Sequence, residues 1–411
     1  MTLASTRPAG PLWRERGFAV FLSAQTLSVA GDSFALIALP LLVLRATGSV
    51  AQMGLLTGAA GAAAIVAGIF AGNLADRLDR WALMLGCDLA RLVLYGLIPV
   101  AWAIDPQVWL LYVILPVCAA IGMVFEVTYV TVIPALAGPD RITEANGLLY
   151  ATAAAAGIAG PLLAGLVSGA FGPAGAIAVD AGSFAVSAAG LLLVRRWRPA
   201  RSPGAGPDGA ARGRGWRDLL AGASFLWRQP VLRTLTVMLA VFIFATYGLT
   251  DVIIYYLKHD LGQPDGVVGL VLGVAAVGTV GGALAVAPLR RRLGFGRCWI
   301  GSLVLAGLAV GGLGAAGRVP AVAALAACYL ACVSVAGICS MSLRQQLTPD
   351  YLLGRVTAAF WTIHYAPGPV GAALLTWAAG HAGVTATCLA SGAVCLLLGL
   401  AAVASPVRSA S

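Results

Sequence analysis

The chain is dominated by apolar runs about as long as a bilayer is thick. Of its 411 residues, 60% are hydrophobic and only 10% are charged, whereas a soluble domain carries about 25% charged residues. A helix needs about 20 apolar residues to cross the hydrocarbon core of a membrane. Twelve runs approach or exceed that length: residues 17–44, 50–71, 82–104, 108–133, 145–169, 174–194, 231–257, 265–287, 298–316, 320–343, 355–380 and 384–404. We therefore expect an all-α membrane protein with twelve transmembrane helices (spans 1 to 12) in a lipid bilayer.

The distribution of basic residues predicts which side each loop occupies. With the N-terminus placed inside, 22 of the 26 Lys and Arg residues lie on the inner side, and only Arg45, Lys258 and Arg318 lie in outer loops. Arg91 lies within span 3. Cytoplasmic loops carry the excess of Lys and Arg, so we expect both termini in the cytoplasm and the protein in the cell (inner or plasma) membrane. The net charge of +10 is accounted for by these loops, and we expect no nucleic-acid partner.

A polar stretch divides the spans six and six. We expect an N-terminal half at 1–194, a cytoplasmic linker at 195–229 and a C-terminal half at 230–411. The first part of the linker is rich in Pro and Gly and reads as flexible. Its last part, from Trp216 to Trp227, is amphipathic and is expected to lie on the inner membrane surface.

The two halves carry matching dipeptides. Pro139-Asp140 after span 4 corresponds to Pro349-Asp350 after span 10, and Gly160-Pro161 in span 5 corresponds to Gly368-Pro369 in span 11. The two offsets are nearly equal, at 210 and 208 residues. Parallel repeats with a site between them near the membrane midplane are the pattern of alternating-access carriers.

The loop GNLADRLDR between spans 2 and 3 resembles the GxxxDR(x)xR loop of major facilitator superfamily transporters. Gly72, Asp76, Arg77 and Arg80 match that pattern, while Asp79 and Trp81 depart from it. An ordinary basic loop would explain the arginines but not the glycine and the aspartate. The resemblance implies the major facilitator fold and a conformational latch at this loop. Asp88 and Arg91, three residues apart on one face of span 3, are expected to support the latch.

Other segments resemble the exporter branch of the superfamily that includes macrolide-efflux and siderophore-exporter proteins. They are LSAQTLSVAGDSFALIALPLLVL in span 1, ALAGPDRITEANGL after span 4 and QQLTPDYLLGRV after span 10. GIAGPLLAG in span 5 is similar to the antiporter signature of drug/proton exporters, with Gly157, Gly160, Pro161 and Gly165 in the motif positions. The alternative is simple close packing, since small residues let membrane helices approach one another.

Two carboxylates are the candidates for proton coupling. An ionisable side chain in mid-bilayer costs about 2.5–3.5 kcal/mol on insertion scales, so it should face a cavity or a partner. Asp32 lies near the middle of span 1 and Glu126 in the inner half of span 4. The resemblance implies that both face the central cavity, where binding and release of a proton would couple transport to the proton gradient. The alternatives are that Asp32 pairs structurally with a neighbour such as Gln25, and that Glu126 serves the inner gate.

Aromatic and polar residues near these carboxylates are the candidates for binding substrate. The expected cavity residues are Gln25, Phe125, Tyr129, Tyr247, Asp251, Trp361 and His364. Aromatic faces beside carboxylates suit amphiphilic or cationic organic molecules, although aromatic residues in membrane helices also serve packing. A lone histidine such as His364 is also found as a hydrogen-bonded structural residue. Asp180 in span 6 is expected to be a packing or surface residue.

These features predict a carrier and not an enzyme. The sequence contains no GxxxxGK[ST] loop for ATP, and the eight cysteines show no metal-ligand pattern, so we expect no cofactor. The predicted function is proton-coupled efflux of a small amphiphilic compound, a drug or secondary metabolite, with antibiotic resistance as a consequence. We expect a monomer. The rivals are a carrier of the same fold for a siderophore or lysophospholipid, and a transport-dead membrane sensor.

Overall fold

The computed structural model describes residues 12–138, 141–197 and 215–409, and all regular structure in those ranges is helical. The predicted all-α fold is therefore confirmed. The first half contains α1 (Arg16–Thr47), α2 (Val50–Arg77), α3 (Arg80–Ile104), α4 (Val108–Ala137) and α5 (Ile142–Trp197). The second half contains α7 (Pro230–Thr246), α8 (Leu249–Tyr255), the π-helical turn η3 (Tyr256–Asp260), α9 (Asp265–Leu313), α10 (Val319–Leu347), α11 (Asp350–Tyr365), α12 (Gly368–Ala382) and α13 (Val384–Val403). The short helix α6 (Gly215–Arg228) lies between the halves in sequence.

Nine helical segments in the described ranges are long and apolar enough to cross a membrane. Two of them far exceed the length needed, because α5 has 56 residues and α9 has 49. Each is broken at a glycine, Gly172 or Gly294, with φ at 75°, a conformation that residues with a Cβ rarely adopt. The predicted twelve crossings follow if α5 and α9 each cross twice and α11 and α12 cross together. That count stays a prediction.

Two predicted spans are not continuous helices. The run at 231–257 is interrupted between α7 and α8, and the run at 355–380 is interrupted between α11 and α12. Pro367 supplies no backbone N–H for a continuous helix. The breaks lie side by side, since a methyl group on Gly368 would come within 3.0 Å of the Tyr247 ring. Hydropathy does not show the interruptions, because the residues around them remain apolar.

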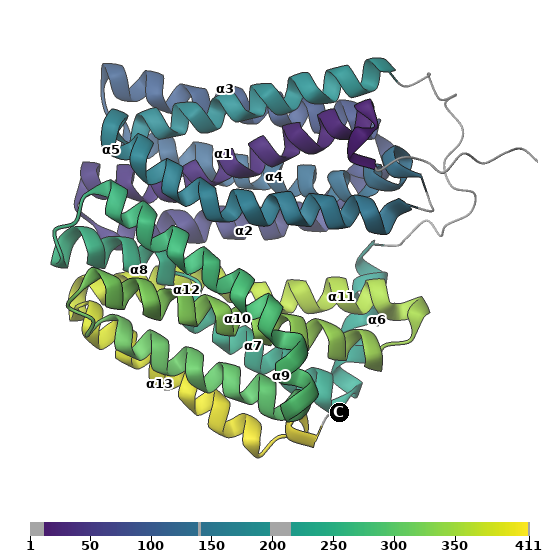
Figure 1. Ribbon diagram of the computed structural model, residues 1–411, viewed down its shortest axis with the longest axis vertical. Helices are drawn as coiled ribbons and strands as arrows, with labels where there is room; N and C mark the ends of the chain where they lie inside the picture. Colours follow the sequence, from purple (N-terminus) through teal and green to yellow (C-terminus); the bar gives the residue numbers. More distant parts are fainter. Residues whose placement is uncertain (1–11, 139–140, 198–214, 410–411) are drawn as a thin grey trace, which may run out of the picture.

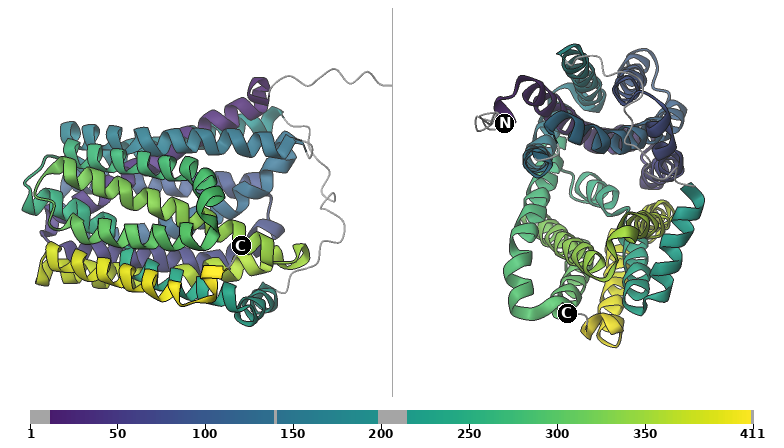
Figure 2. Two further views of the ribbon diagram at one scale, coloured as in Figure 1. Left: turned by 60° about the horizontal axis from the view of Figure 1, so that its bottom comes forward. Right: turned by 90° about the vertical axis from the view of Figure 1, so that its right-hand side faces the viewer.

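The halves form two groups of roughly parallel helices (Figures 1 and 2). In Figure 1 the first half lies above and the second half below, and both helix groups run from left to right. We call the end where α5 finishes and α6 begins the linker end. The opposite end, which holds the connections at Gly48, Asp105 and Gly383, is called the far end.

The buried apolar residues show that the halves are joined at the far end. One core combines residues of both halves there, for example Leu41 of α1 with Leu257 of η3 and Val268 of α9. At the linker end each half has a separate core, one around Phe21 and the other around Trp299. Burial of apolar surface is the main favourable term in such packing. The structure is therefore closed between the halves at the far end, and each half packs on itself at the linker end.

The linker helix α6 packs against the second half. A methyl group on Gly222 would collide with the backbone of Arg355 in α11, and Leu226 is fully buried. Leu220 and Trp227 remain exposed, each at 52%. Because they are seven residues apart, they share one face of the helix. This exposed apolar face fits the predicted position at a membrane surface.

Candidate functional site

Small residues let the two halves approach closely at the far end. A methyl group on Gly58 of α2 would lie 2.6 Å from the Pro369 carbonyl oxygen of α12. A methyl group on Gly165 of α5 would lie 2.7 Å from the Gly269 Cα of α9. Backbones that meet at these distances leave no room for a side chain. Allowing such close approach is the usual role of small residues between membrane helices.

The predicted antiporter motif lies at this seam. Gly165 and the Pro161 carbonyl oxygen contact Gly269 of the other half, whereas a methyl group on Gly160 would lie 2.5 Å from the Ser33 Cβ of α1. Gly157 has open space where its Cβ would be. Three of the four motif residues therefore hold α5 against α1 and α9. A role in antiport remains a prediction.

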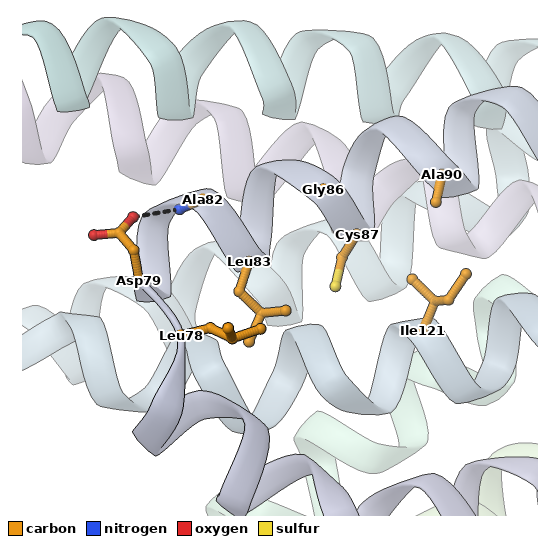
Figure 3. A pocket seen from close by; sticks show the side chains of 8 residues that line it. All are labelled: Leu78, Asp79, Ala82, Leu83, Gly86, Cys87, Ala90 and Ile121. Carbon is orange, nitrogen blue, oxygen red and sulfur yellow. Dashed lines mark hydrogen bonds between the residues drawn. The ribbon is translucent and has the colours of Figure 1, made fainter.

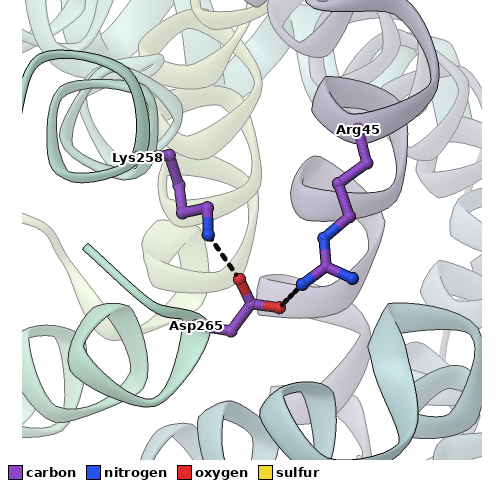
Figure 4. Close-up of polar contacts among 3 residues, drawn as sticks. All are labelled: Arg45, Lys258 and Asp265. Carbon is purple, nitrogen blue, oxygen red and sulfur yellow. Dashed lines mark hydrogen bonds and ion pairs between the residues drawn. The ribbon is translucent and has the colours of Figure 1, made fainter. Parts of the chain in front are cut away.

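A three-residue ion cluster also joins the halves at the far end (Figure 4). Arg45 of α1 contacts the Asp265 carboxylate at 2.5 Å, and Lys258 of η3 contacts its other oxygen at 2.8 Å. The Asp265 side chain is only 1% exposed. Asp265 is also the first residue of α9, where the helix dipole favours a negative charge. The cluster therefore holds α1 of the first half to the start of α9 in the second.

Asp32 forms an ion pair near the middle of the first half. Its carboxylate lies 2.5 Å from Nη2 of Arg91 on α3. The Arg91 side chain is 12% exposed, whereas the Asp32 side chain is 44% exposed. A charged group that faced lipid hydrocarbon would be costly. We therefore assign the exposed side of Asp32 to the space between the helices and not to lipid.

Two further polar residues lie behind this pair. Asp88 of α3 is fully buried, and neither of its carboxylate oxygens has a hydrogen-bond partner among the described residues. Ser187 of α5 lies beside it. Gln25 of α1 is buried and donates from its amide to the Ser187 hydroxyl at 3.1 Å. Gln25 thus links α1 to α5 in this conformation and does not pair with Asp32, the alternative considered above.

Glu126 on α4 is exposed, and it interacts electrostatically with both Asp32 and Arg91. Its neighbours Phe125 and Tyr129 stack on each other with ring centroids 6.3 Å apart. Phe125 is buried in the linker-end core of the first half. The charges of the two predicted coupling carboxylates, Asp32 and Glu126, thus act on each other in the structure. The aromatic pair lies toward the linker end.

The predicted residues of the second half gather around the helix breaks. Tyr247 lies at the break after α7 and packs edge to face with Tyr365 at the end of α11, with ring centroids 6.4 Å apart. Its hydroxyl also reaches α2, where it would lie 3.2 Å from a methyl group on Gly61. Asp251 of α8 is buried beside Thr57 of α2, and its Oδ2 has no partner among the described residues. Tyr247 and Asp251 therefore both lie against the first half.

Trp361 and His364 of α11 form the rest of this aromatic group. Trp361 is 40% exposed, whereas His364 is 7% exposed and stacks on Phe360 with ring centroids 5.3 Å apart. The His364 Nδ1 has no hydrogen-bond partner among the described residues. Of these two predicted cavity residues, only Trp361 presents a large exposed surface in this conformation.

The loop that resembles the superfamily latch joins α2 to α3. Asp79 is the N-cap of α3 and accepts a hydrogen bond from the Ala82 amide at 2.7 Å. Arg80 donates to the Thr131 carbonyl of α4 at 3.2 Å, and Arg77 is exposed. The Asp76 side chain and the surroundings of Gly72 lie outside the described part of the structure. Arg91 pairs with Asp32, not with a described residue of this loop.

An apolar groove runs along α3 beside this loop (Figure 3). Its lining consists of Leu78, Asp79, Ala82, Leu83, Gly86, Cys87, Ala90 and Ile121. Apart from Asp79, the lining is apolar or lacks a side chain, and it contains none of the predicted cavity residues. A groove of this composition between membrane helices suits lipid chains better than a polar substrate.

Three further charged residues are buried, and burial agrees with one of the two expectations for Asp180. Asp180, expected to be a packing or surface residue, is fully buried and interacts electrostatically with Asp32 and Arg91. Arg344 was counted with the inner loops, but it is 1% exposed and its guanidinium lies 3.9 Å from the Phe360 ring centroid. Asp265 was not singled out at all. No local motif marks any of them.

Comparison with known proteins gives a consistent result. The sequence profile of the Major Facilitator Superfamily matches residues 21–372. The multidrug efflux pump Tap of Mycolicibacterium fortuitum is 27% identical over 395 residues, which cover 94% of this chain and 95% of that protein. The enterobactin exporter EntS of Escherichia coli is 24% identical over 407 residues, covering 97% of this chain and 92% of that protein.

Solved structures show the same fold. A crystal structure of the nucleoside transporter NupG matches with a TM-score of 0.73 at 13% identity, covering 94% of this chain and 98% of that chain. A bacterial homologue of the human lysosomal transporter Spinster, solved in an inward-facing and unoccupied conformation, matches with a TM-score of 0.71 at 17% identity, covering 96% of each chain.

Proposed function

This chain belongs to the major facilitator superfamily, and from that membership we propose that it is a proton-driven exporter of small amphiphilic compounds. The superfamily consists of membrane carriers and not of enzymes. The similarity to a multidrug efflux pump over almost the whole of both chains supports efflux of drug-like compounds. We propose a monomer that works by alternating access between its two halves.

The orientation follows from charge. With the linker end in the cytoplasm, the basic loops between spans 2 and 3 and between spans 8 and 9 lie inside. The closed far end then faces outward, so the conformation described above is inward-facing. An exporter in this state is ready to take substrate from the cytoplasm or the inner leaflet.

A topology reporter tests this orientation. We expect a reporter fused after Ser411 to be cytoplasmic and one inserted near Gln263 to be external, because 22 basic residues lie on the linker side and three on the far side. Phosphatase and fluorescent-protein fusions at the two positions give the measurement. The reverse pattern would invalidate the orientation, and the conformation would then be outward-facing.

The observation that carries proton coupling is the Asp32–Arg91 pair. Asp32 is half-exposed toward the space between the helices while its partner is nearly buried. Protonation of Asp32 would remove the charge that holds Arg91, so proton binding and helix packing are linked at one contact. Glu126 is the other predicted coupling carboxylate, and its charge interacts with both members of this pair. Loss and gain of a proton at these groups would favour different conformations of the carrier.

We place the substrate between the two halves on the linker side of the far-end seam. Glu126 and Tyr129 line the first half, and Tyr247 and Trp361 line the second. Phe125, His364, Asp251 and Gln25 are buried in this inward-facing state, so they would contact substrate only after rearrangement. Carboxylates with aromatic rings favour compounds that are cationic or amphiphilic.

A siderophore is the second candidate cargo, because the enterobactin exporter covers as much of the chain as the multidrug pump does. Lysophospholipids are a third, and a transport-dead sensor is the rival outside transport. A thermal-shift screen of the purified protein against antibiotics, siderophores and lysolipids separates the cargoes. Counterflow of the bound compound in liposomes then separates a carrier from a sensor, since a sensor would bind without counterflow.

The latch loop gives a further prediction. The resemblance implies that Asp76 helps to hold the linker end shut in the opposite, outward-facing state, as an anion near a positive helix end. We expect Asp76→Asn to lower transport without abolishing substrate affinity, as measured by counterflow and by thermal shift. Asp105→Asn at an exposed far-end loop serves as the control. Transport by Asp76→Asn at the wild-type rate would show that the loop only sets the orientation of the helices and is not a latch.

A further inference from the structure

Asp180 is a buried carboxylate outside the predicted coupling and binding residues. It lies in α5, is fully buried, and presses against α1, where a methyl group on Gly31 would come within 2.9 Å of its Oδ1. The Ser183 hydroxyl donates to that oxygen at 3.4 Å. The other oxygen, Oδ2, has no hydrogen-bond partner among the described residues. An ionised carboxylate in this position would be poorly compensated.

Arg91 is the cation that acts on Asp180, and it is already engaged. Its guanidinium contacts Asp32 at 2.5 Å and lies 3.9 Å from the ring centroid of Phe184, one turn beyond Asp180 on α5. The Arg91 Nε has no hydrogen-bond partner among the described residues. Arg91 also interacts electrostatically with Asp180. Arg91 therefore pairs with a carboxylate on α1 and packs over a ring of α5 one turn from Asp180.

The other titratable groups near Arg91 and Asp180 are acidic or neutral. They are Asp32 on α1, Asp88 and Tyr95 on α3, and Cys118 and Glu126 on α4. If Asp32, Asp88 and Asp180 were all ionised, one positive charge would face three negative charges in a buried space. Burying an uncompensated carboxylate is far more costly than burying the neutral acid. The excess charge is removed most simply by protons on the carboxylates that do not contact Arg91.

We propose that Asp180 is a second proton-binding site, which holds a proton while Asp32 pairs with Arg91 and becomes the ionised partner of Arg91 when Asp32 is neutral. In the exchange, an O–H bond breaks at Asp180, an O–H bond forms at Asp32, and Arg91 moves from one carboxylate to the other. The number of protons and the total charge do not change. Because of the exchange, the buried Arg91 keeps an ionised partner even when the cavity-facing Asp32 is protonated.

The role of this exchange in transport rests on the proton coupling proposed above, but the proton on Asp180 can be observed without transport. Infrared spectroscopy of the purified protein detects the C=O stretch of protonated carboxyl groups, and no substrate or pH gradient is needed. The difference spectrum between wild type and Asp180→Asn at neutral pH should contain one such band. Asp105→Asn, at an exposed carboxylate that accepts a hydrogen bond from Gln107, should give none. Absence of an Asp180-dependent band would overturn the proposal.

Asp32→Asn gives the decisive comparison, because it fixes position 32 in a neutral form. Asp180 should then ionise against Arg91, so the band should be absent from the difference between Asp32→Asn and Asp32→Asn/Asp180→Asn. Persistence of the band would show that Asp180 never serves as the partner of Arg91 and would overturn the exchange. A merely structural Asp180 would keep its proton in both backgrounds.

Thermal unfolding provides a second measurement. Asp32→Asn and Asp180→Asn each leave Arg91 with one of the two carboxylates, Asp180 or Asp32. The double variant leaves it with neither. The unfolding midpoint should therefore fall by more in the double variant than the two single changes add up to. Additive changes would contradict a shared partner. If proton-driven transport fails while the infrared and unfolding results hold, the proposed function is wrong but Asp180 remains a proton site.

Discussion

Asp32→Asn should keep substrate exchange at equal pH and lose accumulation driven by a pH gradient. The substituted amide has nearly the shape of the protonated acid but cannot release a proton. With one proton coupled to each substrate, a difference of one pH unit supplies about 1.4 kcal/mol, or about a tenfold accumulation ratio. In the variant that ratio should fall to one. The compound to use is one that binds in the thermal-shift screen.

The matched control for this variant is Asp105→Asn, since Asp105 is exposed at the far end and distant in sequence from every predicted site residue. It should accumulate substrate like the wild type. Wild-type accumulation by Asp32→Asn would exclude Asp32 as an essential coupling group. The search would then move to Glu126, Asp251 and His364. Loss of both exchange and accumulation would instead indicate that the Arg91 contact is needed for folding.

Gly269→Ala should strongly disfavour closure of the far end. The added methyl group would lie 2.5 Å from the Pro161 carbonyl oxygen and 2.7 Å from the Gly165 Cα, and both are backbone atoms that cannot turn away. Overpacking of this kind costs typically about 1–3 kcal/mol, which changes the ratio of inward-facing to outward-facing molecules by about 5–150-fold. Transport should fall accordingly, because the cycle needs the closed far end.

Gly281→Ala on the same helix is the control, because the space around its Cβ position is open. Spin labels at the exposed positions Asp105 and Arg318, one in each half, report the separation of the halves at the far end by pulsed electron resonance. Gly269→Ala should lengthen the distances and Gly281→Ala should not. Unchanged distances in Gly269→Ala would show that the glycine contact does not hold the seam.

The fold was largely predictable from sequence, because membrane crossing depends on local hydropathy and length. The observed helix boundaries agree with most of the predicted apolar runs. The profile match confirms the family that the loop around Asp76 suggested. The breaks at Tyr247 and Pro367 were not predicted. Pro367 is a local signal for the second break, but the apolar run continues through both, so hydropathy alone does not reveal them.

The candidate site was predictable only in part. The free-energy cost of placing a charged side chain in the bilayer pointed to Asp32 and Glu126. In the structure the charges of these two carboxylates act on each other. The partner of Asp32 is Arg91, 59 residues farther along the chain, which was expected to support the latch loop. Pairing across helices depends on how the helices rotate and cross, so it could not be deduced from spacing within one helix. The same reason explains why the contacts of Asp265 and Arg344 were not predicted.

Proton movement during transport is the most direct test of the central claim. The purified protein would be reconstituted into liposomes that contain a pH-sensitive dye, and a gradient of the bound compound would be imposed with no initial pH difference. Proton-coupled efflux predicts that wild type moves protons against the compound and changes the internal pH, while Asp32→Asn moves the compound without a pH change. Transport of the compound by wild type with no proton movement would contradict the account.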